Sequence, residues 1–397
     1  MSRRFNAHPL FEWHAICCIQ VFGTMKLTQM TMSRHGDGPE ERTQSIPLGA
    51  SIGADRSFAS RKPNEGLTMA RKILSLVMVG LFLTLARQAV AGQYAFVRSV
   101  GSYGTENGQL YNPYGLAVDS QGNIWVVDNA NNRIQEFDSA GGFIRTFGSY
   151  GTDNGQFNNP HYLAIDPSGN VWVADTSNHR IQEFDSTGGF IRTFGSYGHD
   201  NGQFASPMGL ASDALGNVWV GSYFDQRIQE FDSAGAFIRT FVTGNGQYLN
   251  NNALAVDSSG NIWVGDDFNH SVQEFDSAGG FVGTFGSYGP GNGQFDYPEG
   301  ITTDSSGNVW VADSANHRIQ EFDSAGGFIG TFGNNGTGNG LFSYPCGVAI
   351  DPSGNVWVAD TNNNRIQEFA VIPDVPEPAT ISLLALGALV LIRRRKR

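Results

Sequence analysis

Short segments with alternating apolar and polar residues recur along the chain from about residue 94 to residue 370. Residues 171–173 (Val-Trp-Val) and 190–194 (Phe-Ile-Arg-Thr-Phe) show this period of two, and clusters of glycine, asparagine and serine separate such segments. A period of two places successive side chains on opposite faces of a β-strand, and the clusters are typical of tight turns. The pattern therefore predicts an all-β protein of many short strands.

Six tryptophans set the register of an internal repeat, with spacings of 47, 47, 44, 47 and 47 residues. Each copy contains four strand-like segments, and four antiparallel strands at this period are typical of one blade of a β-propeller. We therefore expect six blades around a common axis, with the tryptophan rings between the sheets. The six residues are Trp125, Trp172, Trp219, Trp263, Trp310 and Trp357.

The two ends of the array predict how the ring closes. Residues 94–104 match the fourth strand of a repeat, whereas the last repeat stops after residues 365–369 and lacks that strand. The N-terminal strand would complete the last blade and so remove the open sheet edges of an unclosed stack. The predicted fold is an all-β, six-bladed β-propeller with four antiparallel strands per blade, in which the N-terminal strand closes the last blade.

The repeated frame resembles that of the NHL-repeat family of propellers. The resemblance rests on residues 113–119 (Pro-Tyr-Gly-Leu-Ala-Val-Asp), 173–175 (Val-Ala-Asp) and 178–181 (Asn-His-Arg-Ile), and it covers roughly residues 94 to 370. Members of this fold include protein and RNA binders, sensor domains and some lyases or hydrolases. The resemblance thus implies a fold but no single function.

The region before the array contains the successive parts of a secretory signal peptide, in the usual order. Arg71 and Lys72 precede an apolar run at residues 73–85, and a small-x-small cleavage site follows at residues 89–91. The run is shorter than an ordinary membrane span. We assign residues 69–91 to the signal peptide and residues 92–371 to the propeller. Residues 1–68 show no periodicity and are interpreted as an over-extended start or a disordered leader.

The C-terminal region, residues 372–397, resembles the PEP-CTERM sorting signal. Pro376, Glu377 and Pro378 precede an apolar run at residues 381–392 and a basic end. The run would lodge transiently in the inner membrane while the basic end stays in the cytoplasm. The resemblance implies processing by an exosortase and delivery to the surface or extracellular matrix of a Gram-negative bacterium; a plain tail anchor is the alternative. The basic end includes Arg393, Arg394 and Arg395.

Charge and cysteine content narrow the classes of partner. Residues 92–374 contain nine arginines, no lysine and 30 acidic residues, so this part of the chain would repel phosphate backbones. Nucleic acid is therefore excluded as a partner. Cys346 is the one cysteine of the predicted mature protein, which leaves no internal disulfide framework. We expect a monomer held together by packing and strand pairing.

One position on a single face of the predicted propeller differs in every blade. It lies at the start of the first strand, nearest to the central channel. Different polar groups that converge on one opening are the usual signature of a ligand-binding site, although drift at an exposed position is the alternative. The six residues are Tyr114, His161, Met208, Asn252, Glu299 and Cys346.

Blades three and four depart from the frame on the same face. Elsewhere an aspartate follows the second strand and an arginine opens the third, as in Asp175 and Arg180, which predicts a structural charge-assisted hydrogen bond. Blade three has Ser222 in place of the aspartate, and blade four has Ser271 in place of the arginine. A surface with a separate function and simple drift both explain this. The same loops carry three aromatic residues, Tyr223, Phe224 and Phe268.

The function that these observations favour is binding. The chain has no nucleophile elbow, zinc-protease motif or phosphate loop. We expect an exported cell-surface or matrix propeller that recognises a protein, peptide or glycan with its variable loops, without cofactor or metal. The alternative is a lyase or lactone hydrolase in the channel, with His161 as the base and Glu299 as its partner. A purely structural spacer in the matrix is a third possibility.

Overall fold

The structure is a computed structural model that describes residues 17–21, 24–28, 43–44, 93–242 and 251–372. It divides into two compact units, Met1–Val79 and Gly80–Arg397. In the first unit, β1 (Cys17–Val21), β2 (Thr24–Thr28) and β3 (Thr43–Gln44) form a three-stranded antiparallel sheet. The predicted signal peptide and sorting tail lie outside the described residues, so both assignments stay predictions. The described residues contain no helix long and apolar enough to span a bilayer.

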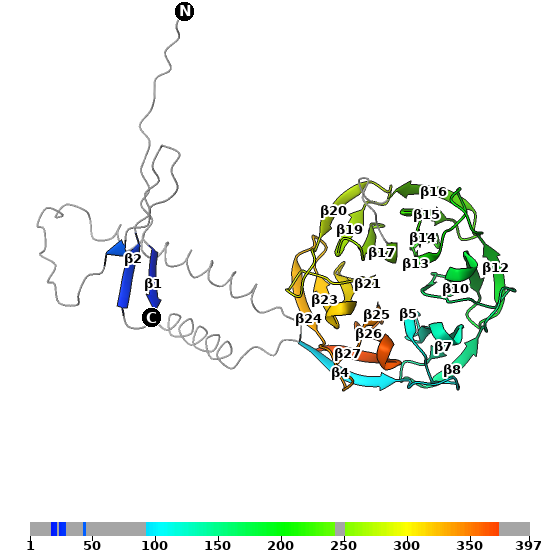
Figure 1. The fold of residues 1–397 in the computed structure, drawn as a ribbon, viewed down its shortest axis with the longest axis horizontal. Coiled ribbons are helices and arrows are strands. Elements are labelled where there is room, and N and C mark those ends of the chain that lie inside the picture. Colours follow the sequence, from blue (N-terminus) through cyan, green and yellow to red (C-terminus); the bar gives the residue numbers. More distant parts are fainter. Residues whose placement is uncertain (1–16, 22–23, 29–42, 45–92, 243–250, 373–397) are drawn as a thin grey trace, which may run out of the picture. The chain divides into compact units, whose positions relative to one another are not determined.

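The second unit contains six four-stranded antiparallel sheets arranged in a ring (Figure 1). Blade one consists of β5 (Pro113–Val118), β6 (Ile124–Asp128), β7 (Arg133–Phe137) and β8 (Phe143–Phe147). Blade two consists of β9 (Leu163–Ile165), β10 (Val171–Asp175), β11 (Arg180–Phe184) and β12 (Phe190–Phe194). Blade three consists of β13 (Pro207–Ser212), β14 (Val218–Ser222), β15 (Arg227–Phe231) and β16 (Phe237–Val242).

The remaining blades repeat this order, and the predicted fold is confirmed. Blade four consists of β17 (Asn251–Val256), β18 (Ile262–Asp266), β19 (Ser271–Phe275) and β20 (Phe281–Phe285). Blade five consists of β21 (Pro298–Thr303), β22 (Val309–Asp313), β23 (Arg318–Phe322) and β24 (Phe328–Phe332). Blade six consists of β25 (Pro345–Ile350), β26 (Val356–Asp360), β27 (Arg365–Ile372) and β4 (Gln93–Val100). Single 3₁₀ turns follow the second strand in four blades: η1 (Asn129–Asn131), η2 (Thr176–Asn178), η3 (Ser314–Asn316) and η4 (Thr361–Asn363).

The turn after each first strand explains why the strands end where they do. In blade two, the Asp166 carboxylate accepts hydrogen bonds from Ser168 N at 2.8 Å and Asn170 N at 2.9 Å. Gly169 has a φ of 86°, a backbone conformation that glycine adopts readily and that residues with a Cβ atom rarely adopt. Asp166 Oδ2 also accepts a bond from Trp172 Nε1 at 3.1 Å, so one carboxylate ties the turn to the buried tryptophan. Local turn chemistry therefore fixes the register of the first two strands.

The N-terminal strand closes the ring, as predicted. β4 pairs with β27 from Ile366↔Val100 to Ile372↔Gln93. β27 and β4 have eight residues each, whereas the third and fourth strands of the other blades have five or six. The closing pair is thus the longest strand pairing of this kind in the described propeller, and it joins segments from opposite ends of the array (Figure 1).

Aromatic triads fill most of the seams, the contacts between neighbouring blades. In the seam between blades one and two, the ring centroids of Phe147 and Phe184 are 4.7 Å apart, and those of Phe157 and Phe184 are 5.5 Å apart. Burial of three such rings stabilises each seam by several kcal/mol (about 2 kcal/mol per ring). Equivalent triads are Phe194, Phe204 and Phe231; Phe285, Phe295 and Phe322; and Phe332, Phe342 and Phe369.

The closing seam between blades six and one has smaller side chains at two of these three positions. Val100 and Leu110 stand where the other triads have phenylalanine, and Phe137 is the one ring left. A groove of about 590 Å³ lies beside them, lined by residues that include Val100, Gly141 and Phe143. The closing seam therefore has the least aromatic packing of the seams that the structure describes.

We expect the substitution Val100→Phe to raise the free energy of unfolding by about 1 kcal/mol, because it fills the groove as the phenylalanines fill the other seams. Urea unfolding monitored by tryptophan fluorescence would measure the change. The matched control, Phe147→Val, should open a similar groove in the next seam and lower the stability by about 2 kcal/mol. If Val100→Phe destabilised the ring, the groove would not be free to accept a larger side chain.

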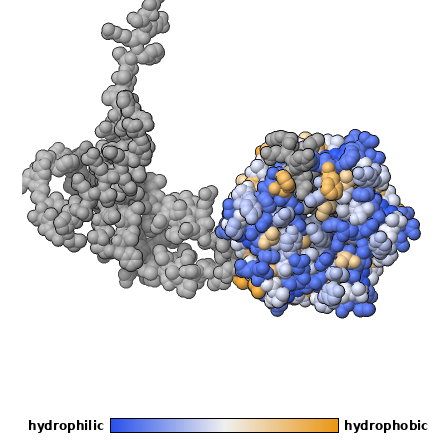
Figure 2. All heavy atoms as spheres, viewed as in Figure 1, coloured by the Kyte–Doolittle hydropathy of each residue, from blue (hydrophilic) through white to orange (hydrophobic). Residues whose placement is uncertain are grey.

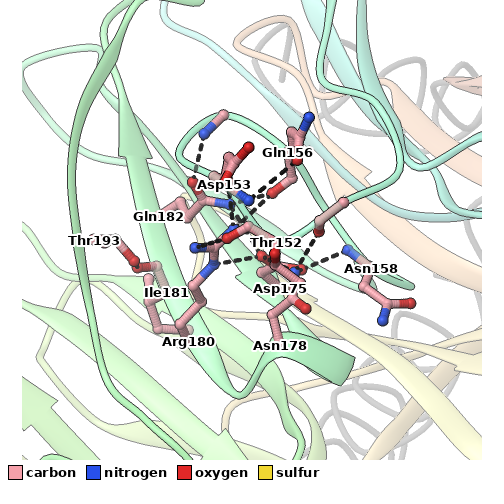
Figure 3. A network of polar contacts seen from close by, with 12 residues as sticks. Thr152, Asp153, Gln156, Asn158, Asp175, Asn178, Arg180, Ile181, Gln182 and Thr193 are labelled. Atoms are coloured by element: carbon pink, nitrogen blue, oxygen red, sulfur yellow. Dashed lines mark hydrogen bonds and ion pairs between the residues drawn. The ribbon is translucent and has the colours of Figure 1, made fainter.

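A polar network ties each blade to the loop that enters it. In blade two, Asp175 and Arg180 form the predicted ion pair, with Arg180 Nε 2.7 Å from Asp175 Oδ2. Arg180 also donates to the carbonyl oxygens of Asp153 and Gln156, at 2.8 and 2.9 Å (Figure 3). The ion pair recurs in blades one, five and six at 2.6, 2.7 and 2.7 Å, which confirms its structural role in these blades.

Blade three keeps this ion pair in a shifted form, which corrects the expectation that Ser222 breaks it. Asp225 Oδ2 lies 3.7 Å from Arg227 Nη2 and accepts a hydrogen bond from Ala205 N at 2.9 Å. The carboxylate of Asp175 makes the corresponding backbone contact in blade two. Asp225 lies in the loop three residues after Ser222. In blade three this loop residue therefore supplies the carboxylate that the last residue of the second strand supplies in blade two.

Candidate functional site

Two sets of loops share one face of the propeller, which we call the loop face. One set consists of the inter-blade loops, which connect the fourth strand of a blade to the first strand of the next. The other set connects the second and third strands of each blade. In blade two the sets are joined, because Asn178 Nδ2 donates to the carbonyl oxygen of Gly151 at 2.8 Å and Ser177 N donates to that of Asn158 at 3.0 Å.

The six residues that differ between blades lie on this face at the start of the innermost strands. His161 lies two residues before β9, and the other five are the second residues of their strands. Their described side chains are more buried than an exposed, drifting position would be: the exposed fractions are 8% for Met208, 6% for Glu299 and 0% for Cys346. The side chain of Asn252 lies outside the described part of the structure. The five variable residues whose side chains are described are Tyr114, His161, Met208, Glu299 and Cys346.

Glu299 is the centre of the contacts that join these residues. Tyr114 Oη donates to Glu299 Oε2 at 2.5 Å, and Tyr344 Oη donates to Oε1 at 3.1 Å. Burial raises the pKa of Glu299, and the hydrogen bonds from the two tyrosines lower it in part. The carboxylate of blade five is thereby tied to blades one and six.

Tyr162 reaches from blade two to the inner strands of blades five and six. Its hydroxyl donates to the carbonyl oxygen of Glu299 and lies 3.3 Å from that of Cys346. The inner strands also approach closely, since a Cβ on Gly300 would lie 2.1 Å from the carbonyl oxygen of Cys346. A cavity of about 220 Å³ remains in the channel, lined by Tyr162 and by later residues of the inner strands. None of the six variable residues lines it.

His161 is held as a neutral imidazole. Its Nδ1 lies 3.0 Å from the carbonyl oxygen of Asn159 and 3.1 Å from Thr176 Oγ1. Because Thr176 Oγ1 donates to the carbonyl oxygen of Pro207 at 2.7 Å, Nδ1 carries the ring proton and donates it. Burial lowers the pKa of His161 to about 4. Its ring centroid lies 4.7 Å from that of Tyr114, so a tyrosine packs between His161 and Glu299.

Asp267 adds a second buried carboxylate beside Glu299. It is 4% exposed, and its Oδ1 has no hydrogen-bond partner. Burial raises the pKa of Asp267 well above its usual value, and the charge of Glu299 raises it further. At the same position in blades two and six, Thr176 and Thr361 donate to a proline carbonyl of the next blade, at 2.7 and 2.8 Å. A carboxylate cannot make this bond.

The aromatic residues of blades three and four form a separate group on the loop face. Phe224 is 66% exposed and lies between β14 and β15, and Phe268 is 64% exposed and lies between β18 and β19. Tyr223 packs against Phe224 with ring centroids 4.7 Å apart. Rings as exposed as those of Phe224 and Phe268 contribute little to folding, so both rings are accessible to a ligand.

The buried groups near the axis do not form a metal centre. Among the residues that the structure describes, no cluster of three or more histidine, cysteine, aspartate or glutamate side chains is arranged to hold a metal ion. Cys346 is a free and fully buried thiol, and burial raises its pKa well above the usual value. The arrangement around Glu299 is therefore a network of hydrogen bonds between neutral hydroxyls and carboxyl groups.

Sequence reasoning missed three residues that shape this region: Tyr162, Tyr344 and Asp267. Comparison of the repeats could have identified Tyr162. The corresponding residue in three other blades is a glycine: Gly115, Gly300 and Gly347. A tyrosine at a position that is glycine in other repeats indicates a side chain with a role specific to that blade. Asp267 replaces a hydroxyl or amide residue in four other blades. Both substitutions are visible in the sequence, but their partners are not.

Comparison with known proteins identifies two features of the chain. The NHL repeat family matches residues 110–137, 157–184, 295–322 and 342–369. These segments lie in blades one, two, five and six, the blades with the complete aspartate–arginine pair. The PEP-CTERM protein-sorting motif matches residues 374–397. Both resemblances are confirmed, and the motif implies export in bacteria and processing by an exosortase.

Solved structures with the same fold share little sequence with the chain. Virginiamycin B lyase from Staphylococcus aureus has a TM-score of 0.50 and 17% identity, covering 70% of this chain and 100% of its own. A gluconolactonase from Xanthomonas campestris has a TM-score of 0.51 and 13% identity, with coverage of 71% and 98%. A protein of unknown function from Bacteroides thetaiotaomicron has a TM-score of 0.58 and 15% identity, with coverage of 70% and 76%. These likenesses show the fold alone. No curated protein matches the chain.

Proposed function

From a six-bladed propeller that carries NHL repeats and a PEP-CTERM sorting motif, we propose an exported, non-catalytic binding protein of the bacterial cell surface or extracellular matrix. It acts as a monomer and recognises a protein, peptide or glycan with its loop face. The observation that carries this proposal is the exposure of Phe224 and Phe268, at 66% and 64%, on loops of neighbouring blades. Aromatic side chains are enriched in the binding centres of protein interfaces.

The contacts of Glu299 support binding over catalysis. An enzyme in the channel would use His161 as a base and Glu299 as its partner. Tyr114 packs against the ring of His161 and donates to one oxygen of Glu299, and Tyr344 donates to the other oxygen. Both carboxylate oxygens are thus engaged within the protein. These bonds join three blades, which supports a role in holding the inner strands together.

The fold gives the loop face a rigid base for binding. Buried tryptophans and phenylalanine triads fix the blades, and the aspartate–arginine pairs fix the loops on the blades. A surface that is ordered before binding loses less conformational entropy on association. The surface of the propeller in the view of Figure 2 is mainly hydrophilic, with small scattered apolar patches.

We expect the double substitution Phe224→Ser with Phe268→Ser to weaken binding of the full chain to bacterial cell-surface material by at least tenfold (a loss of about 1.4 kcal/mol). Co-sedimentation with the surface fraction of an exosortase-bearing bacterium would measure it. The melting temperature should change little, since exposed substitutions usually alter stability by about 0.5 kcal/mol or less.

The matched control is Leu215→Ser. Leu215 is 84% exposed in the turn after β13, on the face opposite to the loop face. This change should leave co-sedimentation intact. Equal retention of all three proteins would refute recognition by the loops of blades three and four. A catalytic turnover that His161→Ala abolishes without unfolding the protein would instead favour the enzyme.

A further inference from the structure

Four inter-blade loops present a tyrosine at the same position of the repeat. Tyr103, Tyr150, Tyr197 and Tyr288 follow the glycine-serine pair that ends the fourth strand, and they precede a second glycine. Their exposed fractions are 66%, 71%, 66% and 67%. These are among the most exposed large side chains of the described propeller, and all four lie in the loops of the loop face.

The loops that carry these tyrosines are fixed from below. In blade two, Gly155 N donates to Gln182 Oε1 at 2.9 Å, and Gln182 Nε2 donates to the carbonyl oxygen of Gln156 at 2.7 Å. Arg180 binds three carbonyl oxygens of the same loop, those of Thr152, Asp153 and Gln156 (Figure 3). The side chain of Tyr150 therefore projects from a loop whose backbone is fixed by hydrogen bonds.

The loop does not need a tyrosine to form. In blade six, Asn335 occupies this position and makes the same backbone bridge, Asn335↔Phe342, that Tyr150 makes with Phe157. The following glycine, Gly336, has a φ of 158°, as Gly151 has in blade two. Packing into the seam comes from Phe157 and Phe342, which are fully buried. The four tyrosines thus have no structural task that the asparagine does not also perform.

Three of the four tyrosines extend into small aromatic platforms. Tyr103 lies edge-to-face with Tyr111, with centroids 5.1 Å apart. His179 lies 5.0 Å from Tyr197, and His270 lies 4.8 Å from Tyr288. With exposed fractions of 66% and above, these tyrosines remain largely accessible to solvent beside their aromatic neighbours.

We propose that the four tyrosines form a multivalent binding site for an uncharged polysaccharide. The electron-rich face of a phenol ring attracts the polarised C–H groups on the apolar side of a sugar ring. Four like side chains at the same repeat position suit a ligand that is itself a repeat of like units, and several weak contacts on one scaffold add to a strong one. The nine arginines and 30 acidic residues of residues 92–374 disfavour an anionic polymer.

This inference goes beyond the proposed function because it rests on other residues and names the class of ligand. Phe224 and Phe268 lie between second and third strands, whereas the tyrosines lie in inter-blade loops. The two sets can therefore be substituted separately. A site of several weak platforms predicts that the loss of affinity grows with each tyrosine removed, which a single pocket does not.

Affinity gel electrophoresis of the full chain tests the proposal, with a uniform glucan, mannan, galactan or soluble chitin oligomer mixture in the gel and alginate as the anionic probe. We expect retardation by at least one uncharged polymer and none by alginate. Replacing one tyrosine by serine should weaken the interaction two- to threefold. The quadruple variant Y103S/Y150S/Y197S/Y288S should weaken it by 100-fold or more. Quadruple replacement by phenylalanine, which keeps the ring, should preserve most of the affinity.

The chain offers two further controls. Asn335→Tyr adds a fifth tyrosine in the loop that enters blade six and should strengthen retardation, whereas Leu215→Ser on the opposite face should change nothing. Absence of retardation by every uncharged polymer, or full retardation of the quadruple serine variant, would overturn the proposal. Loss of retardation in the Phe224 and Phe268 variant alone would also overturn it, while the proposed function would stand. Capture of a protein by the tyrosines in place of a polysaccharide would refute the ligand class.

Discussion

Deletion of residues 93–100 is expected to abolish folding of the whole propeller and not only of its last blade. The deletion removes β4 and leaves β27 as an unpaired edge of eight residues. It also removes Tyr94, whose ring lies 5.4 Å from Trp310 and 4.6 Å from Phe332 of blade five, and Val100, which packs in the seam with blade one. The strand β4 therefore pairs within blade six and also packs against blades five and one.

The expected result is an aggregated protein without a cooperative thermal transition, because an unpaired apolar edge is a template for association. Size-exclusion chromatography and circular dichroism during heating would measure both properties. A deleted protein that melts like the intact one would contradict the closing role of β4.

A rearranged chain gives the matched control for this deletion. Gln93 pairs with Ile372 in the closing sheet, so a two-residue Asn-Gly turn can join Ile372 to Gln93 as a hairpin. The protein that begins at Gly101 and ends with this transplanted strand contains the same residues in the same sheet. We expect it to fold and to melt within a few degrees of the intact protein.

The substitution Asp267→Thr is expected to stabilise the protein by about 2 kcal/mol at pH 7, the usual scale for relieving an unpaired buried group. The change removes a carboxylate whose Oδ1 has no partner and that lies beside Glu299. A threonine can instead donate to the carbonyl oxygen of Pro298, as Thr361 donates to that of Pro113. Chemical unfolding of both proteins would measure the difference.

The gain should depend on pH in a defined direction. Because the pKa of Asp267 is raised in the folded protein, the unfolded chain releases this proton first as the pH rises. Stability then falls with pH until the folded carboxyl group also ionises, and the cost persists above that point. The gain from Asp267→Thr should therefore be larger at neutral pH than below about pH 4, the usual aspartate pKa.

Two observations would contradict this account of Asp267. One is a gain that is the same at pH 3 and pH 7, which would exclude ionisation as the cause. The other is a loss of stability, which would mean that the carboxylate has a favourable partner. The reciprocal change Thr176→Asp should destabilise blade two by a similar amount, because it replaces a hydroxyl that donates to Pro207 by an acceptor.

The sequence predicted the fold well because the fold repeats the same local rules six times. Alternation, turn residues and the tryptophan spacing each recur, and the missing fourth strand of blade six has one possible source at the N-terminus. The aspartate–arginine pair was also predictable, since the two partners lie five residues apart on either side of one hairpin turn. Interactions within one repeat are therefore accessible to sequence reasoning.

The contacts across the axis were not predictable in the same way. Tyr114 and Glu299 are separated by 185 residues, and Tyr162 and Cys346 by 184. The repeat places all six first strands at the centre, but which side chain meets which depends on the size of each residue there. Glycine at Gly300 and Gly347 lets the strands approach, and Tyr162 then fills the space. Position alone predicted six side chains around one opening, whereas the structure shows that Tyr114, Tyr162 and Glu299 bond to one another's blades across it.

The pairing of Gln93 with Ile372 has a consequence for how the ring can be mounted. The polypeptide arrives at the circumference and departs from it at a single spot on blade six. A tether on either side of the propeller in the chain would therefore be joined to it at this one place. Blades one to five bear neither end of the described propeller, so such an attachment would not involve their loops.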